Sequence, residues 1–217
     1  MDDDFCLLPE DLSEYIEEHT SPVEALLSAL DRDTHVNVLC PRMLSGAYQG
    51  KLLEFLSRMI APERILEVGT YTGYSAICLA KGLKPGGRLL TIEHNPELEE
   101  RIRAYLGKAG LSDMVELRIG EAAELLPELP EAGFDLVFLD ADKAHYAEYY
   151  PLLKRVLKPG GWLLIDNVLW NGKVWSADAK DKDTRAVRDL NRMVLEDPEV
   201  ENVLLPVRDG INIVRKL

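Results

Sequence analysis

The stretch 64–75, which reads R-I-L-E-V-G-T-Y-T-G-Y-S, constrains the fold of this chain more than any other segment. Its first five residues are mostly apolar and predict a short strand that is buried on both faces. Gly69 and Gly73 then predict a turn into a helix, where backbone amides can approach a ligand at the carboxyl end of the strand. Glu67 adds a carboxylate there, which would repel a pyrophosphate and favour a ligand with a cationic amine or sulfonium.

A second feature of the same strand–helix–strand unit points to a nucleoside. The apolar run 88–93 ends in Glu93, about twenty residues beyond the glycine turn, where nucleoside-binding folds place the acid that accepts the ribose hydroxyls. The loop reads G-T-Y-T-G and lacks the G-x-G-x-x-G pattern of nicotinamide-binding proteins. An NAD-dependent oxidoreductase is therefore the weaker interpretation of this unit.

From residue 64 onward, apolar runs alternate with amphipathic stretches, which is typical of an α/β fold with a mostly parallel sheet and helices on both faces. The dipeptide Asp209-Gly210 between the last two apolar runs predicts a hairpin, so the final strand is expected to run antiparallel at the end of the sheet. The sequence Lys-Pro-Gly-Gly occurs twice, at 84–87 and 158–161, and predicts a turn before a strand. The predicted strands are 64–68, 87–93, 114–119, 134–140, 161–166, 200–207 and 211–214, and the predicted helices are 73–82, 96–109, 121–128, 145–157 and 180–196.

Three further helices are expected before the first strand. Two of them span 9–19 and 22–31, and Ser21 is predicted to cap the second. The third begins near Leu44 and ends before Pro62, and one apolar face is expected to pack on the core. That face consists of Leu44, Ala47, Tyr48, Leu52, Phe55, Leu56 and Met59.

The composition fits one globular domain over residues 1–217, since 47% of the chain is hydrophobic and 29% is charged. Within it, we expect residues 1–61 to form a lid or an interface and residues 62–217 to form the ligand-binding α/β core. The formal net charge of -13 opposes a polyanionic partner such as tRNA or DNA. Small-molecule substrates are therefore favoured.

Two simple observations predict the compartment. No apolar run approaches the roughly 20 residues that cross a bilayer, and the acidic amino terminus lacks the basic flank of a signal peptide. Cys6, Cys40 and Cys78 are scattered without a C-x-x-C pair, so neither a disulfide framework nor a zinc site is expected. A cytoplasmic protein is the resulting prediction.

Oxygen-bearing side chains follow two neighbouring strands of the predicted sheet. Asp140 ends one strand, and Asp166-Asn167 ends the next. Because the carboxyl ends of parallel strands meet at one edge, these three side chains are expected to converge and to bind Mg2+, with Ca2+ or Mn2+ as alternatives. Lys143 follows on the same loop, and a lysine that is desolvated beside a metal is a candidate general base.

Four motifs in order, L-E-V-G-T-Y-T-G-Y-S, L-L-T-I-E-H-N-P-E, L-D-A-D-K and L-L-I-D-N-V-L-W-N-G, carry a resemblance to a known family. Together they resemble the cation-dependent class I O-methyltransferases that include the caffeoyl-CoA and catechol enzymes. The resemblance extends from about residue 42 to the end. It implies a Rossmann-like fold with a seven-stranded, mostly parallel sheet, a homodimer, and S-adenosylmethionine as methyl donor.

The resemblance also implies a role for each residue of the site. Glu93 would hold the ribose, and Ala122 would lie at the adenine. Asp140 would lie near the methionine amine and also bind the metal with Asp166 and Asn167, while Lys143 would be the base. The residues implied at the methionine end are Met43, Ser45, Glu67, Gly69, Tyr71 and Ser75.

Two comparisons with members of that family bear on the substrate class. The animal catechol enzyme carries a His-Trp pair where this chain has Ala141-Asp142, which favours the plant and bacterial caffeoyl-CoA-like branch and a substrate with vicinal hydroxyls. Some bacterial relatives of similar appearance methylate a hydroxyuridine at the tRNA wobble position. A basic patch of Arg42, Lys51, Arg58 and Lys173 would be needed for that alternative.

Overall fold

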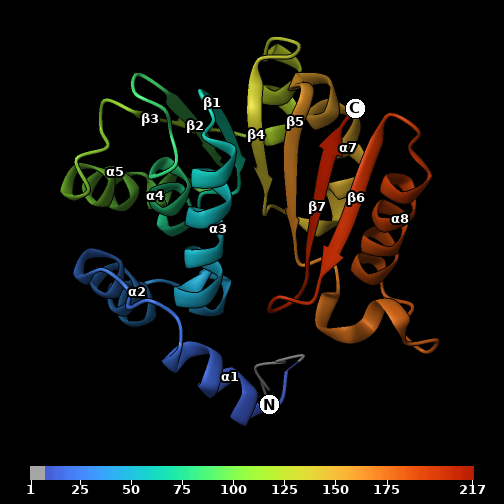
Figure 1. The fold of residues 1–217 in the computed structure, drawn as a ribbon, viewed down its shortest axis with the longest axis horizontal. Helices are drawn as coiled ribbons and strands as arrows, with labels where there is room; N and C mark the ends of the chain where they lie inside the picture. The colour runs from blue at the N-terminus through green and yellow to red at the C-terminus, as the bar shows by residue number, and fades with distance from the viewer. Residues whose placement is uncertain (1–7) are drawn as a thin grey trace. The chain divides into compact units, whose positions relative to one another are not determined.

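The structure is a computed structural model that describes residues 8–217, and its internal contacts divide the chain into two compact units. One unit consists of Thr20–Leu125, and the other consists of Leu126–Leu217 together with the described residues before Thr20. Figure 1 labels the elements of both units. Cys6 lies outside the described residues. None of the described helices is long and apolar enough to cross a membrane.

The unit Thr20–Leu125 contains three parallel strands in the order β3-β2-β1. All of β1 except its first residue is buried, as expected for a strand covered on both faces. Helix α4 contacts β1, β2, α2 and α3, so it lies at the centre of this unit. The elements are α2 (Ala25–Asn37), η1 (Pro41–Met43), α3 (Gly46–Ile60), β1 (Arg64–Val68), α4 (Tyr74–Ala80), β2 (Arg88–Glu93), η2 (Pro96–Leu98), α5 (Glu99–Lys108), β3 (Val115–Ile119) and α6 (Ala122–Leu125).

The second unit contains four strands in the order β4-β5-β7-β6. Strand β5 is parallel to β4, and β7 is antiparallel to both of its neighbours. Helix α7 contacts β5 and α8, and α8 lies along β6 (Figure 1). The elements are α1 (Glu10–Glu18), η3 (Leu126–Glu128), β4 (Phe134–Leu139), η4 (Lys143–His145), α7 (Tyr146–Val156), β5 (Leu157–Asp166), η5 (Trp170–Trp175), α8 (Lys182–Glu196), β6 (Val200–Leu205) and β7 (Ile211–Lys216).

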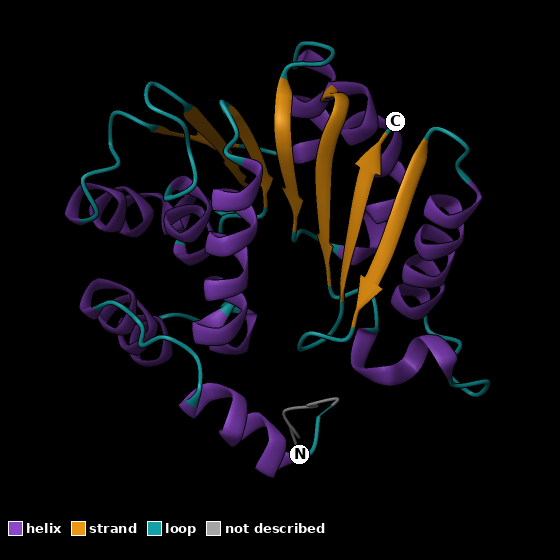
Figure 2. Cartoon of the chain, in the orientation of Figure 1, coloured by secondary structure: helices purple, strands orange, loops and turns teal. Residues whose placement is uncertain are grey.

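The predicted fold class is confirmed: residues 8–217 hold seven strands that alternate with helices, and only β7 runs antiparallel (Figure 2). The predicted hairpin at Asp209-Gly210 joins β6 to β7. Strand β7 lies between β5 and β6. The final strand is therefore an interior strand, where we had expected it at the end of the sheet.

Strand β5 begins four residues before the predicted position, at Leu157. Its register explains the difference, because Phe134 pairs with Leu157 while Leu136 pairs with Trp162. The intervening residues 158–161 form an irregularity inside the strand. The first copy of the Lys-Pro-Gly-Gly sequence is a simple turn, in which the Gly87 amide donates to the Lys84 carbonyl at 2.8 Å.

The predicted limits of the second helix are wrong. Helix α2 begins at Ala25 behind an extended Glu24, and Ser21 does not cap it. At the other end the helix continues to Asn37 because local polar pairs hold its last turns. Asn37 Nδ2 donates to Asp33 Oδ1 at 2.7 Å, one turn away. The helix therefore extends past residue 31, where its apolar periodicity ends.

The predicted apolar face of α3 is also largely wrong. Phe55 and Met59 are 51% and 72% exposed, and the side of the helix that is buried carries Gln49, Gly50, Leu53, Glu54 and Ser57. Close approach of α4 selects this side, since a Cβ on Gly50 would lie 2.5 Å from Tyr74 Cε1. Small residues at the contact allow two helices to pack closely, and this contact overrides the apolar pattern.

Glu54 can lie on the buried side of α3 because three cations surround its carboxylate. Lys51 Nζ lies 3.1 Å from Oε2, Arg58 Nε lies 3.0 Å from Oε1, and Lys81 Nζ from α4 lies 3.4 Å from Oε2. Burial raises the pKa of Glu54, but these partners lower it more, so the net shift is downward. A buried carboxylate with such partners is tolerated.

Candidate functional site

The loop 69–73 has the geometry that the glycine pattern predicts. Gly69, Tyr71 and Gly73 all adopt positive φ, at 99°, 51° and 91°. The Gly69 amide donates to the Ile92 carbonyl of β2 at 3.0 Å, and the Gly73 amide closes the turn on Thr70 at 2.9 Å. Glycine adopts such angles without steric cost, so this loop folds tightly between β1 and α4.

Glu93, the predicted ribose ligand, lies at the end of β2 and is held by backbone amides. Its buried carboxylate accepts hydrogen bonds from the Tyr71 amide at 2.7 Å and from the Asn95 amide at 2.9 Å. Its carbonyl accepts the Gly120 amide at 2.9 Å, just before α6 begins at Ala122. His94 Nδ1 also lies 3.2 Å from Oε1, and a carboxylate has about four acceptor positions, so some acceptor capacity remains. That capacity fits the two hydroxyls of a ribose.

Glu67 lies on β1, next to the strand that ends in Glu93, and has no exposed surface. Its Oε2 accepts a hydrogen bond from Thr91 Oγ1 at 2.5 Å, across the β1–β2 pair in which the two residues are directly opposed. Thr91 also contacts the hydroxyl of Thr70 in the loop. This chain of polar groups ties the end of β1 to the glycine loop.

The other predicted cofactor residues of this unit differ in exposure. Ser75 lies in the first turn of α4 and is buried, as is Ala122 at the start of α6. Ser45 is buried at the start of α3, whereas Met43 is 55% exposed. The Tyr71 hydroxyl donates to the Leu39 carbonyl at 2.9 Å, which links the loop to the segment that carries Met43 and Ser45.

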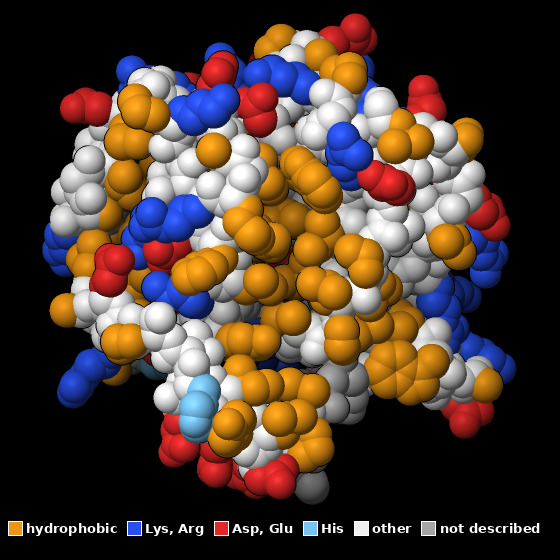
Figure 3. All heavy atoms as spheres, in the orientation of Figure 1, with side chains coloured by type: hydrophobic (Ala, Val, Ile, Leu, Met, Phe, Trp, Pro, Cys, Tyr) orange, Lys and Arg blue, Asp and Glu red, His pale blue; other side chains and the backbone are white. Residues whose placement is uncertain are grey.

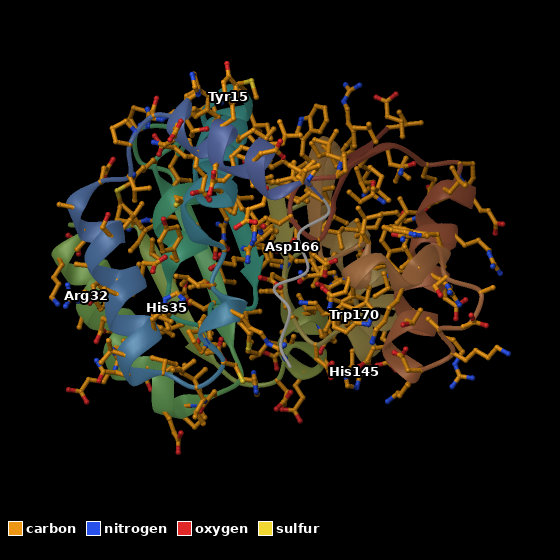
Figure 4. The ribbon with its side chains drawn as sticks, turned by 90° about the horizontal axis from the view of Figure 1, so that it is seen from below. Tyr15, Arg32, His35, His145, Asp166 and Trp170 are labelled. Atoms are coloured by element: carbon orange, nitrogen blue, oxygen red, sulfur yellow. The ribbon has the colours of Figure 1, made fainter. Side chains whose placement is uncertain are left out.

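The predicted metal ligands Asp140 and Asp166 belong to the second unit, at the ends of two neighbouring parallel strands. Leu139 pairs with Ile165, so the residue that follows each of them lies at the same level of the sheet edge. Strands in a sheet lie about 4.8 Å apart. Asp166 is buried at the end of β5, and Figure 4 labels it together with Trp170 of η5 and His145 of η4.

Lys143, the predicted base, is mostly buried and forms an ion pair with Asp140. Its Nζ donates to Asp140 Oδ1 at 2.7 Å. Burial lowers the pKa of Lys143, but the negative charges of Asp140 and Asp166 outweigh it, and the net shift is upward. In this structure Lys143 is thus an ion-pair partner of Asp140, and its role as a base stays a prediction.

Asn167, the third predicted ligand, is held by a residue that sequence reasoning treated only as part of a turn. Its Nδ2 donates to Asp209 Oδ2 at 3.3 Å, and its own backbone has a φ of 57°. Asp209 is also partly buried, and burial raises its pKa. The sequence signal for Asp209 was the antiparallel final strand, which begins at the edge where β5 ends.

The donor set agrees in chemical type with a hard divalent cation. Within residues 8–217, no three His, Cys, Asp or Glu side chains gather as ligands, because the predicted set joins two carboxylates with one amide. Oxygen ligands of this kind suit Mg2+. The Lys143 ammonium already lies against Asp140, which shows that this position attracts positive charge.

Part of the basic patch required for a tRNA substrate is neutralised. Lys51 and Arg58 both pair with Glu54. On the face drawn in Figure 3, lysine and arginine side chains are interspersed with aspartate and glutamate. A nucleic acid usually meets a continuous basic surface, so this pattern weighs against tRNA.

Comparison with known proteins gives a consistent result. The family described as O-methyltransferase matches residues 17–217. A catechol O-methyltransferase from Niastella koreensis is 34% identical over 185 residues, which cover 84% of this chain and 83% of the relative. A caffeoyl-CoA O-methyltransferase from Eucalyptus globulus is 37% identical, over 81% of this chain and 75% of the relative.

A solved structure has the same fold. The O-methyltransferase from Bacillus cereus, in complex with S-adenosylhomocysteine, is 27% identical and superposes with a TM-score of 0.85 over 95% of this chain and 97% of its own. The chain therefore belongs to the O-methyltransferase family, and the predicted enzyme class, an S-adenosylmethionine-dependent O-methyltransferase, is confirmed.

Proposed function

We propose that this enzyme methylates one hydroxyl of a catechol-like or caffeoyl-type small molecule with vicinal hydroxyls, and that it requires a divalent cation. The observation that carries the proposal is the group of Asp140, Lys143, Asp166 and Asn167 around the ends of β4 and β5, of which Asp166 is buried and the others are partly buried. Two carboxylates, one amide and one lysine are the side chains that cation-assisted proton removal from a hydroxyl requires. The catechol and caffeoyl-CoA relatives agree with this substrate class.

The cofactor half of the proposal concerns the glycine loop and Glu93. The remaining acceptor capacity of the Glu93 carboxylate is assigned to the ribose hydroxyls of S-adenosylmethionine. Ser75, Ala122 and the loop residues are assigned to the remainder of the nucleoside and the methionine. We expect Glu93→Ala to weaken S-adenosylhomocysteine binding by about ten-fold or more, because hydrogen bonds to a charged group contribute about 1.5–3 kcal/mol.

The chemistry follows from the charges of the site. A bound Mg2+ would lower the pKa of the neighbouring substrate hydroxyl and fix its orientation. Lys143 owes its upward pKa shift to Asp140 and Asp166, so its basicity near neutral pH depends on neutralisation of those carboxylates. Lys143 then accepts the hydroxyl proton, and the substrate oxygen takes the methyl group from the sulfonium, which leaves S-adenosylhomocysteine. Alignment and charge stabilisation are the protein's main contributions.

Metal dependence is tested directly by methyl-transfer assays on the chelator-treated enzyme with and without Mg2+. We expect activity to disappear in chelator, to return with Mg2+, and to be absent in Asp166→Ala at any Mg2+ concentration. Glu201→Gln is the control, since among the described residues Glu201 forms an ion pair with the exposed Arg215 at 3.0 Å. Full activity of Asp166→Ala in chelator would show that the metal assignment is wrong.

The role of Lys143 is tested separately from cofactor binding. Removal of a general base costs about 10²–10⁴-fold in rate. We expect Lys143→Ala to lose turnover on that scale and to bind S-adenosylhomocysteine as the wild type does, in calorimetric titrations. Equal losses of turnover and cofactor affinity would remove Lys143 from the role of base.

The acceptor is identified by a screen of catechols, caffeoyl thioesters, flavonoids and bulk tRNA. Methylation of tRNA alone, with a steep dependence on salt, would favour the wobble hydroxyuridine alternative over the small-molecule substrate. The cytoplasmic location and the homodimer also remain predictions, and sedimentation of the full chain tests the dimer.

A further inference from the structure

Asp209 lies in the turn between β6 and β7, next to the proposed metal ligands. The antiparallel register places Ile211, the first residue of β7, opposite Asp166 at the end of β5. Asp209 is therefore close to the strand ends that carry the carboxylates, although it is 42 residues from Asn167 in the chain. The proposed mechanism gives this residue no role.

The side chain and backbone of Asp209 hold the loop that follows β5. The carboxylate accepts the Asn167 side-chain amide at 3.3 Å and the Asn171 backbone amide at 2.5 Å. The Asp209 carbonyl accepts the Leu169 amide at 2.8 Å. Both ends of the segment 167–171 are thus fastened to one residue.

The fastened segment has an unusual backbone. Asn167, Trp170 and Asn171 adopt positive φ, at 57°, 47° and 51°. Each such residue costs of the order of 1–2 kcal/mol for an L-amino acid, so the surrounding contacts must enforce the conformation. The hydrogen bonds from Asp209 are among the contacts that do so.

The hydrogen bond from Asn167 Nδ2 to Asp209 determines which end of the Asn167 side-chain amide faces away from Asp209 and can bind a cation. A carboxylate accepts hydrogen bonds and cannot donate them when ionised, so it selects the NH2 end of the Asn167 side chain. The amide oxygen then points away from Asp209. A cation requires the oxygen, and an inverted amide would present two N–H donors instead.

Asp209 is partly buried beside the proposed metal ligands. In the described residues, its carboxylate is held by the Asn167 and Asn171 amides, so its contacts belong to the loop that carries the ligand.

We propose that Asp209 is a positioning residue that holds Asn167 with its amide oxygen toward the divalent cation. This inference rests on the metal site of the proposed function. Outer partners of metal ligands commonly contribute 10–100-fold to metal affinity through the ligand they orient. Asp209 would act in the same way.

The experiment measures Mn2+ binding to the full chain by calorimetry, without substrate, for the wild type and Asp209→Asn. This substitution keeps the size of the side chain and leaves one acceptor oxygen where there were two. We expect the dissociation constant for Mn2+ to rise about 10–100-fold. The control is Asp197→Asn, which removes a carboxylate that accepts Tyr150 at 2.8 Å and Lys154 at 2.7 Å in the same unit. That control should lower the unfolding temperature and leave Mn2+ affinity unchanged.

A double-mutant cycle separates positioning from a general effect on folding or charge. In the Asn167→Ala background, Asp209→Asn should have little further effect on Mn2+ affinity, because the residue it positions is gone. Equal losses in both backgrounds would overturn the inference. If Asp166→Ala binds Mn2+ as tightly as the wild type, the proposed metal site itself is wrong. If Asp166→Ala loses Mn2+ and Asp209→Asn does not, only the role of Asp209 fails.

Discussion

Gly210, the residue after Asp209, allows the β6–β7 turn to pack against the loop that carries Asn167. Its φ is +87°, and a Cβ at this position would lie 2.4 Å from Leu169 Cγ and 2.8 Å from Leu169 Cδ1. The Gly210 carbonyl also accepts the Val168 amide at 3.2 Å. Gly210→Ala therefore combines a disfavoured backbone angle with a steric collision.

Both contributions can be given a magnitude. The positive φ costs an alanine about 1–2 kcal/mol. The collision adds about 1–3 kcal/mol, which is the usual range for overpacking of a well-packed site. Gly160→Ala in the same unit is the matched control, because Gly160 has a φ of +75° and no atom within 4 Å of its added Cβ. We expect Gly210→Ala to lower the free energy of unfolding by about 2–5 kcal/mol and the control by about 1–2 kcal/mol.

The assay is urea unfolding of both variants and of the double variant Gly210→Ala, Leu169→Ala. Removal of the Leu169 side chain beyond Cβ opens space for the new methyl group, so the double variant should lose less than the sum of its single changes. Equal destabilisation by Gly210→Ala and Gly160→Ala would refute the collision. Strict additivity with Leu169→Ala would refute it as well.

Two further predictions concern ionisable groups outside the site. Burial raises the pKa of Asp197, but hydrogen bonds from Lys154 and its neighbours lower it more, so its stabilising effect is present above about pH 4 and is lost as the pH falls further. In urea titrations, Asp197→Asn should cost about 1–3 kcal/mol at pH 7, and the difference in unfolding free energy from the wild type should narrow as the pH falls below about 4. Burial raises the pKa of Cys78 to about 12, whereas Cys40 is exposed. In a Cys6→Ser variant at pH 8, Ellman's reagent should label one thiol rapidly and the second only after denaturation; rapid labelling of both would contradict the burial of Cys78.

The strands of this protein could be predicted because their signals are local. Short apolar runs define β1 to β4 to within one residue. Strand β5 extends further because its irregularity at 158–161 depends on pairing with β4, which is a long-range contact. A turn sequence alone does not distinguish a connection from a bulge inside a strand.

The buried face of α3 could not be predicted because its contacts contradict the apolar pattern. Phe55 and Met59 recur at helical spacing, yet the helix buries Gly50 and Glu54. The geometry depends on how closely Tyr74 approaches Gly50, and the buried charge depends on Lys81 from another helix. Apolar periodicity describes a single helix, so it predicts neither the approach of Tyr74 to Gly50 nor the ion pair with Lys81.

The candidate site was predictable only as far as the chain order of parallel strands allows. Asp140 and Asp166 follow two consecutive strands, so the rule that ligands gather at carboxyl ends is sufficient to place them together. Asp209 lies in the predicted hairpin turn after β6, and neither the turn signal nor the strand-end rule says which strand the hairpin lies beside. It reaches the site because β7 is antiparallel and lies directly beside β5, where Ile211 pairs with Asp166. The position of β7 next to β5 is thus the feature that turns an ordinary hairpin turn into part of the site.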